Sequence, residues 1–146
     1  MHEIHLLCHN LVAPLKNIHL HEMIQKLINK QNESIAIFPK IEFTYVVPSD
    51  LPDELKLNIY RIIQELLNNI LKHAEAKNVE ITIVIKGNCL LITVQDDGKG
   101  FNVSLKRGGL GISNIMDRVV TFNGTVNVQS DLGKGTKTEI TIPHEI

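Results

Sequence analysis

The sequence predicts an α+β fold: a two-layer α/β sandwich in which three helices cover one face of a mixed, mostly antiparallel sheet of about five strands. Three observations lead to this prediction. Apolar residues recur at helical spacing in three segments, and apolar residues alternate along the chain in five others. Consecutive strands are also separated by short turns, and such connections require antiparallel pairing. The length of 146 residues is typical of one domain.

The amino-terminal half predicts a helix, a strand and a long helix. The first helix is expected over about 18–31, on an apolar face made of Leu20, Met23, Ile24, Leu27 and Ile28. A strand follows over 41–47, and Pro48 ends it. The long helix begins within Ser49–Glu54, which offers an N-cap candidate, a proline for the first turn and acids that suit the helix dipole. Its apolar stripe continues to about residue 74.

A β-hairpin is expected next in the chain. Val and Ile residues alternate over 79–85, and apolar residues alternate again over 90–94. Gly87-Asn88 between them is a hairpin turn signal. The second hairpin strand then runs into a glycine-rich loop over 97–109.

The carboxy-terminal part predicts one helix and two strands. The helix is expected over about 110–122, with Gly124 near its end. Val126 begins the first strand, and a glycine-containing turn over 131–135 reverses the chain. The last strand is expected over 136–142, and a proline stops it.

Composition excludes several classes of protein. Fifteen Lys and Arg residues against sixteen Asp and Glu give a net charge of −1, which argues against a strongly basic nucleic-acid-binding or membrane-surface module. The two cysteines form no CxxC motif and no signal-peptide pattern is visible, so we expect a reducing, cytoplasmic compartment. No apolar run approaches the ~18 residues that a membrane span needs.

The long helix carries a polar row with residues three or four apart: Asn58, Arg61, Glu65, Asn69 and Lys72. Glu65 and Asn69 lie about one turn apart on one face. The amide oxygen of Asn69 suits Mg²⁺, and Glu65 can accept a proton or orient a nucleophile. Spacing alone leaves the alternative that this row is an ordinary solvated helix face.

Asp96 continues the apolar parity of the second hairpin strand. If that parity faces the helices, Asp96 points inward and Asp97 points outward. An inward carboxylate is costly unless it finds donors, and a ligand amino group would supply one. Gly98 and Gly100 follow and leave room for close approach to the backbone. The alternative is that Asp96 only caps local N–H groups at a tight turn.

Two further segments allow contacts with a ligand. Residues 107–112, RGGLGI, open a helix, where free N–H groups and glycines form an anion site. They match neither the GxxxxGK[ST] nor the GxGxxG pattern. Thr136 and Thr138 follow a glycine turn and share the parity of the last strand, so both hydroxyls are expected on the buried side near Asp96. Ordinary strand threonines are the alternative interpretation.

Taken together, the four segments resemble the ATP-binding domain of sensor histidine kinases, within the ATPase group that includes gyrase B, HSP90 and MutL. Residues 64–74, QELLNNILKHA, look like the family's N box, and 96–101, DDGKGF, like its G1 box. Residues 109–119, GLGISNIMDRV, look like the G2 box, and 133–136, GKGT, with Pro143 look like the closing segment. The N-box ending and the G2 run are similar to the nitrate-sensor and DesK-type subfamily. The resemblance implies the Bergerat type of two-layer sandwich.

The resemblance implies a role for each matching residue. Glu65 would activate or orient the attacking histidine, and Asn69 would ligate Mg²⁺ that bridges the phosphates of ATP. Lys72 and His73 would lie beside the phosphate chain. Asp96 would accept a hydrogen bond from the adenine amino group, and guanine has a carbonyl there instead. The remaining expected nucleotide contacts are Gly98, Gly100, Gly109, Leu110, Gly111 and Thr136, with Thr138 as the alternative to Thr136.

The resemblance also implies an organisation and partners. Residues 11–146 would form the ATP-binding domain, and residues 1–10 would be the remnant of the end of a dimerisation helix and its connector. None of the first five histidines lies in a matching phosphoacceptor motif, so we expect a catalytic fragment of a longer, membrane-bound sensor. Its partners would be its own dimerisation domain and a response regulator, without nucleic acid or direct membrane contact. The fragment itself would be a monomer or a weak dimer.

Two other functions share the nucleotide fold. One is an anti-sigma-factor-type serine kinase, against which the G2-like helix sequence argues. The other is a nucleotide-binding module without transfer activity, against which the presence of both Glu65 and Asn69 argues. The expected reaction is therefore phosphoryl transfer from Mg·ATP to a histidine nitrogen, with catalysis mainly by positioning and charge neutralisation.

Overall fold

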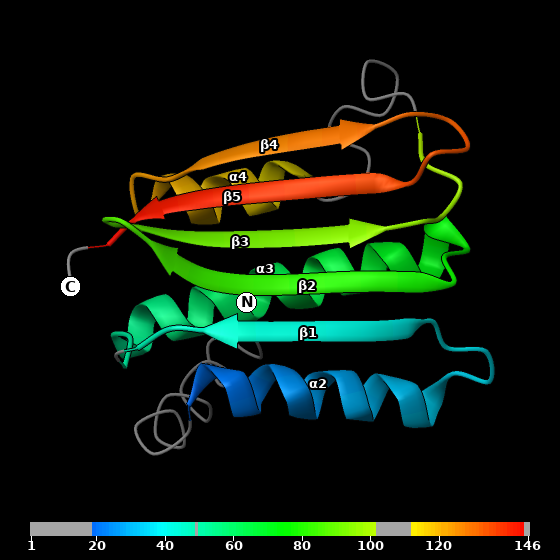
Figure 1. Ribbon diagram of the computed structural model, residues 1–146, viewed down its shortest axis with the longest axis horizontal. Coiled ribbons are helices and arrows are strands. Elements are labelled where there is room, and N and C mark those ends of the chain that lie inside the picture. The colour runs from blue at the N-terminus through cyan, green and yellow to red at the C-terminus, as the bar shows by residue number, and fades with distance from the viewer. Residues whose placement is uncertain (1–18, 49, 102–111, 145–146) are drawn as a thin grey trace, which may run out of the picture.

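The computed structural model of the chain describes residues 19–48, 50–101 and 112–144 (Figure 1). These residues form α-helices, one π-helix and strands in an order that matches the prediction. The elements are α2 (Leu20–Ser34), β1 (Lys40–Val46), α3 (Asp53–Asn69), the π-helix η1 (Ile70–Ala74), β2 (Asn78–Lys86), β3 (Cys89–Asp96), α4 (Ile112–Val120), β4 (Thr125–Ser130) and β5 (Thr136–Pro143).

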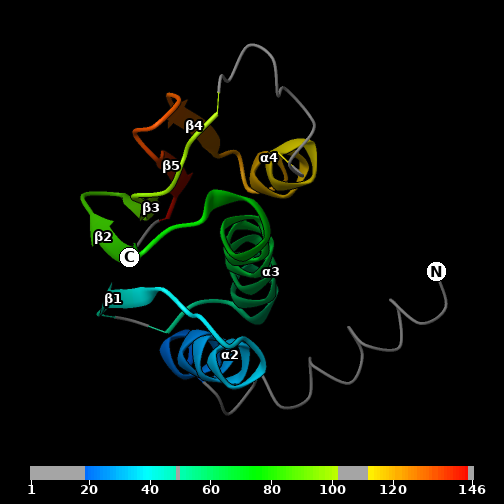
Figure 2. The same ribbon diagram turned by 90° about the vertical axis from the view of Figure 1, so that its right-hand side faces the viewer.

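The five strands form one mixed sheet in the order β1-β2-β3-β5-β4. Strands β1 and β2 pair in parallel, because α3 and η1 carry the chain back across the sheet between them. The other three pairs, β2–β3, β3–β5 and β4–β5, are antiparallel. Figure 2 shows α2, α3 and α4 stacked on one side of the sheet. This confirms the predicted two-layer α+β sandwich.

The core lies between the helices and the inner face of the sheet. In β2, Val79, Ile81 and Ile83 are buried while Glu80 between them is exposed, as the period-2 pattern requires. The facing stripe of α3 is equally apolar, with Ile59 and other aliphatic residues fully buried. Burial of one such aliphatic side chain contributes ~1.5–3 kcal/mol. This continuous core fixes the register of the strands and therefore the placement of the residues at their ends.

The start of α3 differs from the expected side-chain cap. The N-cap residue is Pro52, and no side chain makes a cap hydrogen bond there. The Asp50 carboxylate instead lies 2.8 Å from the ammonium of Lys56, whose side chain is 2% exposed. A second carboxylate, that of Asp53, lies 3.8 Å from the same ammonium. The acids of this segment therefore compensate a buried lysine at the first turn of the helix.

The helix ends show two left-handed residues that are not glycines. Helix α3 continues as η1, and Glu75 with φ 54° ends it. After α4 the left-handed residue is Asn123, with φ 59°, and Gly124 follows it. A Cβ on Gly124 would lie 2.6 Å from the Thr141 carbonyl oxygen. Gly124 is thus needed for close packing against β5, whereas the sequence had indicated a helix-ending role.

Among the residues that the structure describes, no helix is both long and apolar enough to span a lipid bilayer.

Candidate functional site

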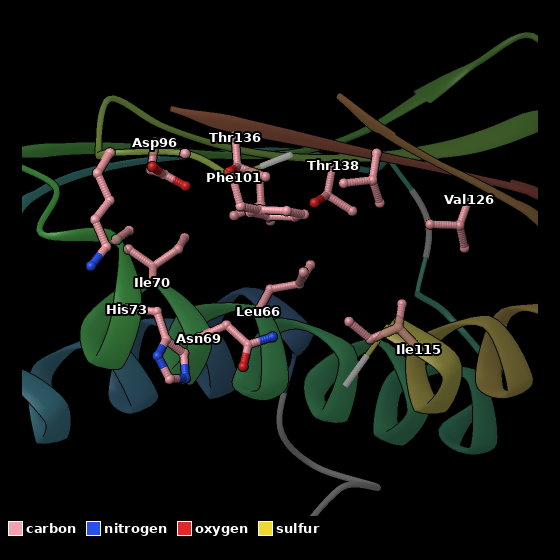
Figure 3. Close-up of a pocket in the computed structure, with 15 residues that line it drawn as sticks. Leu66, Asn69, Ile70, His73, Asp96, Phe101, Ile115, Val126, Thr136 and Thr138 are labelled. Carbon is pink, nitrogen blue, oxygen red and sulfur yellow. The ribbon is translucent and has the colours of Figure 1, made fainter. Parts of the chain in front are cut away.

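A cavity of about 170 Å³ opens between the inner face of the sheet and the helices (Figure 3). Strands β3, β4 and β5 and the segment after β3 form one wall, and α3, η1 and α4 form the other. Most of the lining is apolar, with polar groups at a few positions. The lining residues are Leu66, Asn69, Ile70, His73, Ala74, Val94, Asp96, Lys99, Gly100, Phe101, Ile115, Val126, Val128, Thr136 and Thr138.

Asp96 is the buried acid of this cavity. It is the last residue of β3, its exposed fraction is 5%, and its carboxylate points into the cavity in Figure 3. The Gly98 N–H donates a hydrogen bond of 2.8 Å to Oδ1. Burial raises the pKa of Asp96, although hydrogen bonds from the backbone N–H groups of Gly98 and Thr136 oppose the increase. The inward orientation predicted from strand parity is confirmed.

Asp97, the next residue, faces outward and has a structural role. The N–H groups of Lys77 and Asn78 each donate to its Oδ1 at 2.9 Å, and Asn78 Nδ2 donates to its Oδ2 at 2.8 Å. These hydrogen bonds, with the Asn78 side chain first, hold the pKa of Asp97 below its usual range. Asp97 therefore ties the end of β3 to the start of β2 and holds Asp96 at the cavity.

Thr136 and Thr138 both line the cavity, as parity predicted. Thr136 lies directly opposite Asp96 in the β3–β5 register, whereas Thr138 lies opposite Val94. Thr138 is 4% exposed and Thr136 is half-buried. Thr136 is thus the cross-strand neighbour of the buried acid.

The helix wall contributes Asn69 from α3 and His73 from η1. Both side chains lie across the cavity from the sheet in Figure 3. Glu65, one turn before Asn69, is half-buried and is not among the lining residues that the structure describes. Lys72 is exposed and also lies outside that lining. Of the predicted polar row, the structure therefore brings Asn69 to the cavity lining but not Glu65 or Lys72.

Three glycines permit the close approach of backbone segments around Asp96. A Cβ on Gly98 would clash with the Ala74 carbonyl, at the end of η1. Gly100 and Gly135 have φ of 63° and 77°, and a Cβ on either would clash with a backbone carbonyl. Gly100 lines the cavity, while Gly98 lies beside it. The predicted contacts Gly109, Leu110 and Gly111 lie outside the described residues.

Sequence reasoning did not assign several lining residues to the site. Val126, Val128 and Ile115 fit the apolar patterns of their elements, and only the three-dimensional arrangement shows that they face a cavity. Lys99 and Phe101 line it too, because the loop that follows β3 packs against the end of β4, where Phe101 N–H donates to the Ser130 hydroxyl. Their only signal in the sequence is their place beside the glycines of the DDGKGF segment.

The donor and acceptor groups fit a flat heterocycle with an amino group. Besides its hydrogen bond from the Gly98 N–H, the buried Asp96 carboxylate keeps acceptor lone pairs for a ligand donor, and the apolar walls fit a ring. The Asn69 amide on the helix wall supplies an oxygen of the type that Mg²⁺ accepts. Within the described part of the chain, no group of three or more His, Cys, Asp or Glu residues is placed to hold a metal ion. These groups fit an adenine ring at the carboxylate end of the cavity, with an amide oxygen on the opposite wall.

Comparison with known proteins agrees with this chemistry. Residues 54–146 match the model of a family described as histidine kinase-, DNA gyrase B-, and HSP90-like ATPase. The sensor histidine kinase ComP of Bacillus subtilis is 32% identical over 139 residues, which are 92% of this chain and 18% of ComP. The oxygen sensor histidine kinase NreB of Staphylococcus carnosus is 35% identical over 97 residues, 62% of this chain and 27% of NreB. The chain thus spans less than a third of the length of either relative.

Solved structures share the fold. The histidine kinase domain of the Erythrobacter litoralis EL346 blue-light activated histidine kinase has 25% sequence identity and a TM-score of 0.72, covering 86% of this chain and 65% of that one. The Acinetobacter baumannii histidine kinase AdeS has a TM-score of 0.72 at 14% identity, covering 99% of this chain and 82% of that one. The second likeness concerns the fold alone.

Proposed function

Because the chain belongs to the histidine kinase-, DNA gyrase B- and HSP90-like ATPase family and corresponds to the ATP-binding catalytic domain of sensor histidine kinases, we propose that it binds ATP with Mg²⁺ and transfers the γ-phosphate to a histidine outside this chain. The observation that carries this proposal is the position of Asp96, which is 5% exposed and faces an apolar cavity with Asn69 on the opposite wall. A carboxylate in that environment favours a ligand with an N–H donor.

The purine end of the site consists of Asp96 and its neighbours. Asp96 accepts a hydrogen bond from the adenine amino group, and Thr136, opposite it in the sheet, supports that end of the ring. Thr138 lies two cross-strand pairs further along, on the same face of the sheet, and contacts the ring from the wall. Gly98 and Gly100 let the loop after β3 pack against Ala74 and Asp131, because a Cβ on either would clash with those backbone carbonyls, and this packing holds the loop beside the base.

The phosphate end of the site lies toward α3 and η1. Asn69 would give its amide oxygen to Mg²⁺, and His73 on the cavity rim would lie beside the phosphates. Lys72, which is exposed beside His73, would approach the same phosphates, as would the backbone of residues 109–111. When bound, Mg·ATP supplies the phosphoryl group and the cation that neutralises its charge.

Glu65 is proposed as the residue that receives the incoming histidine. It lies one turn before Asn69 on α3, is half-buried, and is not among the residues that line the cavity. From there its carboxylate can accept an imidazole N–H and orient the other ring nitrogen toward the phosphate. This assignment rests on the place of Glu65, which lies outside the cavity lining but one helical turn from Asn69.

The proposed setting is a longer sensor. The relatives named above are sensor histidine kinases several times longer than this chain. We place the domain on the cytoplasmic side, with residues 1–10 as the end of a dimerisation helix and its connector, in a dimerisation domain that presents the phosphoacceptor further upstream. A response regulator would then receive the phosphate. The isolated chain is expected to be a monomer or a weak dimer.

The first test is nucleotide binding. Titration with ATP and GTP in the presence of Mg²⁺ should give tighter binding of ATP, and Asp96→Asn should lower ATP affinity by about 10- to 100-fold, the range for losing one charged hydrogen bond. Asp97→Asn is not a suitable control, because that carboxylate holds the loop. Glu139→Gln on the outer face is suitable. Equal affinities of the wild-type chain for ATP and GTP would contradict the proposal.

The second test is transfer. The chain would be mixed with Mg·ATP and a separately expressed dimerisation domain of a related kinase. Glu65→Gln should bind ATP as the wild type does, yet lose about 10²-fold or more of the phosphohistidine formed. Phosphorylation of a serine-bearing protein instead of the dimerisation domain would favour the serine-kinase alternative.

A further inference from the structure

The Ser130 hydroxyl joins three segments beside the purine end of the cavity. The Phe101 N–H donates to its oxygen at 2.9 Å, and the hydroxyl donates to the Gly135 carbonyl at 3.1 Å. The Thr136 Oγ1 lies 2.8 Å from it, with either hydroxyl able to donate. Ser130 is the last residue of β4, is half-buried, and is not among the residues that line the cavity.

Counting protons assigns the direction of the ambiguous hydrogen bond. A serine hydroxyl has one proton to donate and two lone pairs to accept with. If that proton goes to the Gly135 carbonyl, which can only accept, the short contact with Thr136 requires the Thr136 hydroxyl to donate to Ser130. This arrangement satisfies all three contacts and uses the full capacity of Ser130. The reverse direction leaves the Gly135 contact without a proton.

The Thr136 hydroxyl is then left with acceptor lone pairs only. Ser130, Thr136 and Asp96 occupy one cross-strand row, in which Thr136 pairs with Ser130 on one side and with Asp96 on the other. Thr136 and Asp96 both line the cavity and lie close together in Figure 3. The wall at this point therefore presents two acceptors, the Asp96 carboxylate and the Thr136 oxygen.

We propose that Ser130 is a positioning residue that fixes the Thr136 hydroxyl as an acceptor, so that this end of the cavity takes a ligand amino group and rejects a ligand carbonyl at the same place. The inference rests on the proposed function and deepens it, because it assigns part of the base selectivity to a residue that does not touch the base. A threonine hydroxyl without such a partner can rotate and donate, and would then accept either group.

Inosine triphosphate provides the probe, since it carries a carbonyl where ATP carries its amino group. The ratio of ATP to inosine triphosphate affinity would be measured by calorimetric titration at constant Mg²⁺. Ser130→Ala frees the Thr136 proton and should lower the ratio about fivefold, which corresponds to one hydrogen bond. Ser130→Thr keeps a hydroxyl and should restore the wild-type ratio. Ser34→Ala, at the exposed end of α2, is the matched control.

A double-mutant cycle separates this role from a structural one. Thr136→Val should lower the ratio by itself, and Ser130→Ala added to it should change the ratio no further, because Ser130 acts through Thr136. If Ser130 only anchors Phe101 and the turn, both affinities would fall together, the ratio would stay constant, and the inference would be overturned. A wild-type chain that binds neither nucleotide would instead overturn the proposed function. Thr136→Val provides the same readout should Ser130→Ala fail to fold.

Discussion

At the scale of single residues, two neighbouring aspartates show how the fold gives identical side chains opposite pKa shifts. Asp96 points into the cavity and its pKa is raised by burial, whereas Asp97 points outward and its pKa is lowered by three hydrogen bonds. The difference arises because successive side chains of a strand face opposite sides of the sheet. One acid is thus held at an energetic disadvantage that a ligand can relieve, while its neighbour stabilises the loop.

The raised pKa of Asp96 predicts a gain in stability when the charge is removed. Between the carboxyl's ordinary value and its raised folded value, the folded chain holds a proton that the unfolded chain has released, so stability falls as the pH rises through that window. Asp96→Asn should therefore melt at a higher temperature than the wild type at neutral pH, with the difference vanishing below about pH 4. The Asn oxygen can still accept from Gly98 N–H.

Thermal melts at several pH values would check this prediction. They would be run without nucleotide and compared with the loss of ATP affinity in the same variant. A melting temperature of Asp96→Asn at or below the wild-type value at neutral pH would show that the buried charge is not a cost to the fold.

The pair of Asp50 and Lys56 predicts the opposite pH dependence. The hydrogen bond from Lys56 lowers the pKa of Asp50, so its stabilising contribution is present above the ordinary carboxyl value and is lost as the pH falls through the lowered folded value. Asp50→Asn should destabilise the chain at neutral pH by about 1–2 kcal/mol. This is less than the ~3–5 kcal/mol for breaking a fully buried pair, because Asp50 is 57% exposed and water screens it.

Denaturant unfolding at neutral and acidic pH would measure that loss. Glu139→Gln, which breaks the exposed 2.9 Å pair with Lys137, is the matched control and should cost at most ~1 kcal/mol. Equal losses in the two variants would mean that burial of the Lys56 ammonium carries no energetic weight.

Residue-level features were the least predictable from sequence. Parity placed Asp96 correctly, because a strand has only two faces. The buried Lys56 and the hydroxyl of Ser130 gave no signal, since each depends on a partner brought from another segment. Phe101 and Ser130, for example, are 29 positions apart and meet only when the loop after β3 packs against the end of β4.

At the scale of elements, the turn between β4 and β5 contains two glycines with similar positive φ angles but different surroundings. Gly133 and Gly135 have φ of 80° and 77°. A Cβ on Gly133 meets nothing within 4 Å, whereas a Cβ on Gly135 would clash with the Asp96 carbonyl. Substitutions at the two positions therefore separate the free-energy cost of a left-handed backbone from the cost of a steric clash.

Alanine at each of these glycines should measure the two costs. Gly133→Ala should destabilise the chain by ~1 kcal/mol, from backbone strain alone. Gly135→Ala should cost ~3 kcal/mol or more and should also weaken ATP binding, because the backbone of Asp96 must move. Chemical denaturation and ATP titration of both variants would test this, and similar values for the two would contradict the close contact.

The apolar periodicity of the sequence predicted which helices and strands form, but it did not predict where they end. The stripe of α3 predicted a helix to about residue 74, and the chain is helical that far, yet its last five residues form a π-helix. Apolar spacing cannot separate these two windings over so short a stretch. The same limit applies to Asn123, which takes the left-handed position that sequence reasoning associated with Gly124.

At the scale of the whole molecule, the cavity lies between the two layers, beneath β3, β5 and β4. Its walls come from α3, η1, α4 and three strands that are distant in sequence. No single segment could reveal it, although the order of the four glycine and acid segments did indicate a nucleotide site. The antiparallel pairing predicted from short turns is correct for β2–β3 and β4–β5, because in each pair the second strand directly follows the first along the chain. Strands β3 and β5 also pair antiparallel, although α4 and β4 lie between them in sequence.

Nucleotide binding should stabilise the molecule as a unit. Mg·ATP at 100 times its Kd should raise the free energy of unfolding by ~2.7 kcal/mol, measured as a shift in the melting temperature. Removal of divalent cations with EDTA should reduce that shift but leave the melting temperature of the free chain unchanged. The reason is that the proposed magnesium site is completed only by the phosphates. A lower melting temperature of the free chain in EDTA would indicate a resident metal.

Helix α3 has a mechanical consequence, because it reaches from one side of the molecule to the other. Its first turn carries Lys56, bound to the Asp50 carboxylate that also lies 3.8 Å from His19, and the cavity begins at its far end with Leu66 and Asn69. Seventeen helical residues extend about 25 Å, and close packing makes such a segment move as a rod. A displacement of α2 at His19 would thus act through Asp50 on the first turn of α3, and a rigid α3 would carry it to Asn69 at the cavity.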